Sequence, residues 1–330
     1  MSGARERIRH AATHGLTILD LSRLGLLELP KEIKELPELT WLDVTGNRLE
    51  RLPDWLGDLT ELTWLEAGKN RLRGLPGSLS VLSGLARVDL HANLIEEFPA
   101  RIIALPSLTH LNLAGNMISR IPENSDGPGR LVTLNMSGNH MDSAPCWIPE
   151  LADLQLLDLG DNRLEAFPDQ LNGSPNMSAL LLGGNRLTSL PDWLGDLTGL
   201  RKLDLSRNAI SKLPDSLSGL EGLRGLHLSH NRLSGLPSSI TGLSSVTSMN
   251  VNGNMINCVP YEITSLKTLT RLDLRDNRLT DISVDLSELP SLTWLGLSGN
   301  PLSRRPPWLS SMPRMKWLES PFESSRAGSR

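Results

Sequence analysis

The sequence predicts an α/β solenoid, a horseshoe of 13 repeats with a parallel β-sheet on its concave face and 3-10 or short helical turns on its convex face. Three observations predict it. An asparagine recurs every 23 residues, leucines keep a constant phase around each asparagine, and an apolar residue followed by proline comes after most of them. A period of about 20–29 residues with this pattern is typical of repeats that stack around one continuous core.

The clearest copy of the repeat is Leu39–Pro53, LTWLDVTGNRLERLP. Its central leucines alternate with polar residues at period two, which predicts a short strand with one buried face. The Leu-Pro pair suits a turn because proline fixes φ and has no amide to donate. Apolar residues at three-residue spacing in the next stretch, 54–62, predict 3-10 or short helical turns.

The recurring asparagine is predicted to turn the chain inward and to pair backbone groups that would otherwise be buried without partners. Leu24 takes this place in the first repeat, where a terminal repeat has one neighbour fewer. We call the set the Asn ladder: Asn47, Asn70, Asn93, Asn116, Asn139, Asn162, Asn185, Asn208, Asn231, Asn254, Asn277 and Asn300.

The ends of the chain fit a capped array. Residues 1–15 predict an N-terminal capping helix with Ile8 and Ala11 against the first repeat, 16–318 form a single repeat domain, and 319–330 form a disordered tail. The convex segment 123–130 lacks the usual leucines. It is read as a looser turn, with a hinge or partner-contact loop as the alternative.

Seven of the thirteen outward positions four residues before each asparagine are acidic. Leu-Asp-Leu is the common sequence of such repeats, so an exposed Asp at this position is interpreted as a solvated residue. The alternative is that these acids form an acidic stripe that selects a basic partner. Trp41 and Trp64 occupy the neighbouring outward column on adjacent strands, followed by Arg87 and His110. The predicted partner-binding residues are Trp41, Asp43, Trp64, Glu66, Arg87, Asp89 and His110, with a separate anchor at Arg271, Asp273 and Trp294.

Trp and Arg are the residue types enriched among binding hot spots, which favours a binding role for this cluster. Two alternatives stay open: the capping helix folds over the Trp rings, or the second Trp is a copy left by duplication. Trp55 and Trp193 lie in identical PDWLGDLT strings on the convex side, where packing is the expected role.

Other function classes lack a signal in the sequence. No nucleophile-elbow, phosphate-loop or zinc-protease motif occurs, so we expect no enzyme activity, no metal and no cofactor. The net charge of −4 and the absence of a basic stripe argue against nucleic acid. No apolar run of about 18 residues or signal-peptide core occurs, which predicts no membrane contact and a cytoplasmic location. The two cysteines, Cys146 and Cys258, are expected to be buried or half-buried.

The 23-residue repeat resembles the intracellular Ras-suppressor-like and bacterial subclass of leucine-rich-repeat proteins. This resemblance covers about nine-tenths of the chain and implies a non-enzymatic scaffold, a monomer that binds a protein partner on its concave face. Two alternatives remain: a translocated bacterial effector that binds a host protein, and a structural spacer without a specific ligand.

Overall fold

A computed structural model describes residues 2–122, 130–148, 151–171, 174, 176–312, 317–319 and 324–326. The described chain divides into two compact units, Met1–Asn162 and Arg163–Arg330, which we call the N-terminal and C-terminal units. That residues 16–318 form a single repeat domain stays a prediction. The segment 123–129, on which the predicted hinge falls, lies outside the described residues.

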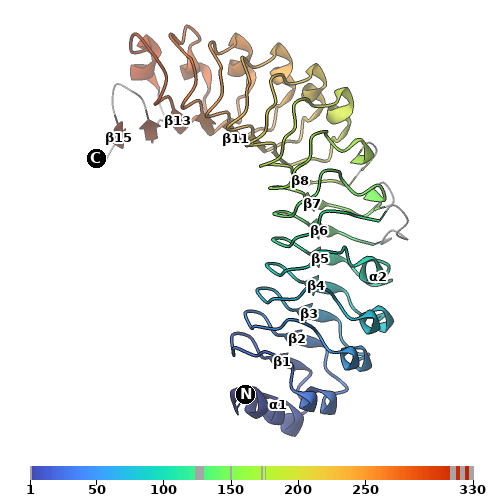
Figure 1. Cartoon of the computed structure of the whole chain (residues 1–330). Helices are drawn as coiled ribbons and strands as arrows, with labels where there is room; N and C mark the ends of the chain where they lie inside the picture. The colour runs from blue at the N-terminus through green and yellow to red at the C-terminus, as the bar shows by residue number, and fades with distance from the viewer. Residues whose placement is uncertain are drawn as a thin grey trace. The chain divides into compact units, whose positions relative to one another are not determined.

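The N-terminal unit begins with a helix and continues as a ladder of parallel strands (Figure 1). Helix α1 spans Ser2–His14, where the capping helix was predicted. The strands are β1 Ile18–Asp20, β2 Trp41–Asp43, β3 Trp64–Glu66, β4 Arg87–Asp89, β5 His110–Asn112, β6 Thr133–Asn135 and β7 Leu156–Asp158. The connecting turns are η1 Lys31–Glu35, η2 Asp54–Asp58, η3 Gly77–Val81 and the single α-helical turn α2 Ala100–Ile103.

The C-terminal unit repeats the same construction. Its parallel strands are β8 Ala179–Leu181, β9 Lys202–Asp204, β10 Gly225–His227, β11 Ser248–Asn250, β12 Arg271–Asp273, β13 Trp294–Gly296 and β14 Trp317–Glu319. Its turns are η5 Asp169–Leu171, η6 Asp192–Asp196, η7 Asp215–Gly219, η8 Ser238–Gly242, η9 Tyr261–Ser265, η10 Leu286–Glu288 and η11 Pro307–Ser311. Strand β15, Ser324–Arg326, pairs antiparallel with β14.

Each strand is three residues long, and in β1–β13 the middle residue is buried in the core. In β2 the middle residue Leu42 is fully buried, while Trp41 and Asp43 on either side are half-buried. Each residue pairs with the one 23 positions further on, as Leu42 does with Leu65. Burying one such leucine stabilises the fold by about 1.5–3 kcal/mol. The sheet, the 3-10 turns and the in-register repeats confirm the predicted leucine-rich-repeat fold class.

Hydrogen bonds of the Asn ladder join each coil to the one before it. Asn93 accepts from the Leu72 amide at 2.9 Å and donates to the carbonyl oxygens of Ala67 and Leu90 at 3.0 and 2.9 Å. Asn70 and Asn116 repeat these contacts. The residue before each ladder asparagine has a positive φ, from +49° at Asp161 to +73° at Gly299, which aims the asparagine side chain inward.

The two ends of the array differ in how far the structure describes them. At the start, α1 buries Ala4, Ile8 and Ala11, each at most 2 % exposed, against the first repeat. At the other end, the turn η11 buries its own residues Trp308 and Leu309. Strand β15 was not expected from the sequence, and the rest of the predicted tail over 319–330 lies outside the described residues apart from Glu319.

Candidate functional site

The sheet face of the N-terminal unit carries the first group of predicted residues. Because each strand exposes its first and third residues, Trp41, Trp64, Arg87 and His110 form one row on β2–β5. Asp43, Glu66 and Asp89 form the parallel row at the other end of β2–β4. The strand register therefore brings all seven predicted residues of this unit together.

The two tryptophans contact each other on this face. Their ring centroids are 6.0 Å apart with the ring planes tilted by 58°. Arg87 places its guanidinium carbon 5.1 Å from the centroid of the Trp64 ring, a cation–π contact. Trp64 remains 37 % exposed, and a shallow hollow of about 210 Å³ lies between it, Arg87 and His110. We call Trp41, Trp64, Glu66, Arg87 and His110 the Trp64 patch.

The acidic row has a structural role that the sequence did not reveal. Asp43 accepts a hydrogen bond from the amide of Thr45 at 2.7 Å, and Asp89 accepts from the amide of His91 at 2.9 Å. The same bond, two residues long, occurs at Asp20, Asn112, Asn135, Asp158, Asp204, Asn250 and Asp273. Both Asp and Asn occur in this column because both provide the acceptor oxygen. These nine Asp and Asn residues thus close the turns after their strands.

Glu66 is the exception among the acids. Its longer side chain makes no such turn bond, and no described residue forms an ion pair with it. Burial raises the pKa of the Glu66 carboxyl above its ordinary value, and the negative charges on Asp43 and Asp89 raise it further. The nearby indole N–H of Trp41 acts in the opposite direction, although it makes no hydrogen bond of regular geometry. Glu66 is therefore a carboxylate without an ion-pair partner among the residues that the structure describes.

The two histidines of this face are held by neighbours. His91 lies over Gly68, where a Cβ atom would collide with its ring, and its Nδ1 is 2.7 Å from the Asp89 carboxylate. His110 Nδ1 is 2.9 Å from the Thr109 hydroxyl. Burial lowers the pKa of His110, and the adjacent Arg87 lowers it further. The imidazole of His110 is therefore neutral at neutral pH.

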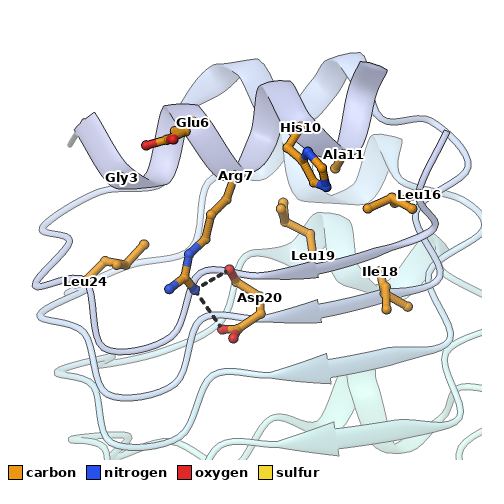
Figure 2. A pocket seen from close by; sticks show the side chains of 10 residues that line it. All are labelled: Gly3, Glu6, Arg7, His10, Ala11, Leu16, Ile18, Leu19, Asp20 and Leu24. Atoms are coloured by element: carbon orange, nitrogen blue, oxygen red, sulfur yellow. Dashed lines mark hydrogen bonds and ion pairs between the residues drawn. The ribbon is translucent and has the colours of Figure 1, made fainter. Parts of the chain in front are cut away.

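Helix α1 leaves the Trp64 patch open. It packs against β1 and η1, and a groove of about 530 Å³ lies between the helix and β1 (Figure 2). Arg7 reaches across the groove to the carbonyl oxygen of Asp20 at 2.8 Å and to its carboxylate at 3.4 Å. Ile18, at the mouth of the groove, is 54 % exposed. The alternative in which the capping helix folds over the Trp rings is excluded by the exposure of Trp64.

The second predicted group lies on β12 and β13 of the C-terminal unit. The Arg271 guanidinium carbon is 3.6 Å from the centroid of the Trp294 ring. Asp273 is 1 % exposed and is held by Arg275, a residue outside the predicted set. The register places Arg271 directly beside Trp294. The separate cluster expected from the sequence is therefore assembled.

Residues outside these faces complete the comparison with the sequence. Trp193 packs edge-on against Phe167 with ring centroids 5.5 Å apart, in keeping with a packing role. Cys146 and Cys258 are exposed, so their expected burial was wrong.

In the part of the chain that the structure describes, no cluster of three or more metal-ligating side chains occurs. None of the helices described is long and apolar enough to cross a membrane.

A family model described as "Leucine rich repeat" matches residues 14–72, 83–141, 175–233, 198–256 and 260–302, well over half of the chain. A comparison with curated proteins found no match.

Among solved structures, a leucine-rich-repeat protein of Leptospira interrogans is 27 % identical with a TM-score of 0.70, and the match covers 94 % of this chain and 98 % of that one. The ectodomain of the Arabidopsis thaliana receptor kinase GASSHO1/SCHENGEN3, in complex with CASPARIAN STRIP INTEGRITY FACTOR 2, is 31 % identical with a TM-score of 0.68. That match covers 88 % of this chain but 39 % of the receptor chain. An internalin of Listeria monocytogenes, 19 % identical with a TM-score of 0.72, covers 89 % of this chain and 94 % of that one and shares the fold.

Proposed function

Because the chain belongs to the leucine-rich-repeat family, we propose that it is a protein-recognition module whose primary contact surface is the Trp64 patch. One observation carries the proposal. Trp64 is 37 % exposed on the open face of the sheet, in contact with Trp41 and Arg87, while the leucines that build the fold are buried on the opposite side. The fold does not use the exposed part of this side chain.

The chemistry of the patch suits a protein surface. A tryptophan ring supplies a large contact area with only two rotatable bonds. Trp and Arg are both enriched among binding hot spots. The hollow beside Trp64 gives a partner side chain somewhere to insert. Glu66 adds a charge that lacks a counter-ion among the described residues, so a basic group of the partner is the best match for that edge of the patch.

The comparisons support the class of function. The similar Arabidopsis receptor ectodomain was solved in complex with CASPARIAN STRIP INTEGRITY FACTOR 2, which shows that this repeat fold can present a surface to a second protein. The identity of the partner does not transfer, since the chain spans 39 % of that receptor chain.

We further propose that the protein acts without catalysis, as a cytoplasmic monomer. The effector and spacer alternatives are tested separately. A translocation assay with a reporter fusion detects export into a host cell. Sedimentation equilibrium detects self-association, which a spacer array would show and a monomeric module would not.

Comparative capture tests the binding proposal. Immobilised wild-type protein, Trp64→Ala and Trp55→Ala are incubated with lysate of the cell of origin, and bound proteins are quantified by mass spectrometry. Trp55 lies on η2, on the turn side of the sheet, so it controls for the loss of a tryptophan. We expect a protein captured by the wild type and by Trp55→Ala and lost with Trp64→Ala. Equal capture by all three folded proteins would remove the Trp64 patch from the contact surface.

A further inference from the structure

Five residues on β12, β13 and the turn after β12 form a second charged cluster on the sheet face of the C-terminal unit. They are Arg271, Asp273, Arg275, Trp294 and Gly296. Two arginines and one buried carboxylate leave the cluster with one excess positive charge. The contacts within it decide which of the two arginines carries that charge outward.

Arg275 is fully engaged by Asp273. Its Nε donates to Oδ1 of Asp273 at 2.9 Å, and its Nη2 donates to Oδ2 at 2.7 Å. Asp273 is 1 % exposed and also accepts from the Arg275 backbone amide at 3.2 Å. A paired fork of this kind is held rigidly, because two parallel hydrogen bonds fix the plane of the guanidinium. Arg275 and Asp273 therefore act together as a neutral support.

Trp294 can approach Arg275 and Asp273 closely because residue 296 has no side chain. A Cβ atom at Gly296 would come within 2.6 Å of the Trp294 ring and within 2.9 Å of both Arg275 Cγ and Asp273 Oδ1. The glycine thus lets the indole ring, the arginine and the aspartate converge above β13. Arg275 is also 5.4 Å from the centroid of the ring. The ring is a fixed platform for whatever lies on its open face.

Arg271 stacks on the Trp294 ring more closely than Arg275 does. Its guanidinium carbon is 3.6 Å from the ring centroid, which is stacking distance. Stacking uses the flat face of a guanidinium and leaves its N–H edge available for planar acceptors. Among the described residues no acceptor bonds the Arg271 side chain and no carboxylate pairs with it. Arg271 is exposed, and its neighbour in the same column is the small residue Ser248 on β11.

We propose that Arg271, held on Trp294, binds the carboxylate side chain of an aspartate or glutamate in an extended segment of a partner protein. The orientation of the guanidinium is already fixed, so little side-chain entropy is lost when the carboxylate docks. The charge of this site is opposite to that of Glu66 in the Trp64 patch. The inference concerns a different unit of the chain and is independent of the proposed function.

The experiment measures fluorescence polarisation of labelled peptides with the full-length protein in about 50 mM salt, where surface charge interactions are weakly screened. The probes are (Gly-Glu)4 with an amidated C-terminus, (Gly-Gln)4 with an amidated C-terminus, and (Gly-Gln)4 with a free C-terminal carboxylate. We expect the Glu peptide to bind about tenfold more tightly than either Gln peptide. Preference for the free C-terminus would overturn the assignment to a side-chain carboxylate.

Matched variants locate the binding site. Arg271→Gln should reduce affinity for the Glu peptide to that for the Gln peptide, and Trp294→Leu should weaken it by releasing the guanidinium. Lys202→Gln removes the same charge from the same outward column on β9 and should leave the affinity within about twofold of wild type. Trp64→Ala should also have no effect. Equal loss with Lys202→Gln, or no loss with Arg271→Gln, would overturn the proposal.

Discussion

At the residue scale, most polar side chains on the inner turns and in the acidic column make fixed hydrogen bonds to backbone groups. Asn93 uses its single side-chain amide to bond backbone groups of its own repeat and of the preceding one. The acids of the neighbouring column use one oxygen to close the turn after the strand, as Asp43 does with Thr45. Glu66 has no such duty, and its pKa is raised. Glu66 lowers the stability of the fold, whereas the other acids of its column raise it. Such a residue is a candidate for function.

Replacing Asn93 with alanine should destabilise the protein by about 3 kcal/mol, because the Leu72 amide and two carbonyl oxygens would be left buried without partners. Urea unfolding followed by circular dichroism measures this loss. Glu96→Ala, at an exposed position in the same repeat, should change stability by less than about 0.5 kcal/mol. A loss at Asn93 as small as at Glu96 would contradict the role of the Asn ladder.

Glu66→Gln should stabilise the protein at pH 7. A carboxyl whose pKa is higher in the folded chain binds more protons when folded, so its contribution to stability falls as pH rises between its unfolded and folded pKa values. Removing the charge should gain about 0.2–1 kcal/mol, near the lower end because solvent screens an exposed group.

The gain from Glu66→Gln should disappear at about pH 3, where the wild-type carboxyl is protonated in both states. Thermal melts at the two pH values measure it. Asp204→Asn keeps the turn-closing oxygen and removes a charge elsewhere in the same column, so it is the matched control. Lower stability of Glu66→Gln at pH 7 would show that the carboxylate is structural.

At the element scale, the three-residue strand is the unit that sorts structural from free positions. The leucine spacing predicted its buried middle residue, and with it the two outward columns. Helix α1 plays the complementary part at the start of the array, where β1 has no preceding coil to cover it. Its buried face consists of Ala4, Ile8 and Ala11.

Ile8→Ala should cost about 2–4 kcal/mol, because Ile8 is 2 % exposed and the helix cannot close the cavity by itself. Hydrogen exchange should show the greatest loss of protection in α1 and β1. Exchange that rises uniformly through the N-terminal unit, or not at all, would contradict a local capping role. Arg9→Ala, on the exposed side of the same helix, is the control.

The strands and turns could be predicted from the sequence because every repeat has the same spacing of leucines around its asparagine position. It missed contacts that depend on turn geometry. The bond from Asp43 to the Thr45 amide requires the chain to bend after the strand, and the leucine spacing carries no information on that bend. Trp294 can lie over residue 296 only because that residue is a glycine and has no side chain. An outward glycine beside an outward tryptophan was the available signal.

At the scale of the whole molecule, the two units present sheet faces of different charge. In the N-terminal unit the outward columns carry Asp20, Asp43, Glu66, Asp89 and Asp158 against a single Arg87. On β8–β13 of the C-terminal unit they carry Lys202, Arg271 and Arg275 against Asp204 and Asp273. We infer that the two faces favour different charges in a partner. Because the inward leucines build the core, we propose that the outward residues without a turn-closing role, such as Trp64 and Arg271, select the partner.

The most direct test of the central claim is the affinity of the captured partner for wild-type protein, Trp64→Ala and Trp55→Ala, measured by isothermal titration calorimetry. We predict that Trp64→Ala loses at least about 2 kcal/mol of binding free energy, roughly a 30-fold weaker Kd, while Trp55→Ala stays within about 0.5 kcal/mol of wild type. Circular dichroism establishes that both variants are folded. Unchanged affinity for a folded Trp64→Ala protein would contradict the claim that the Trp64 patch is the primary contact surface.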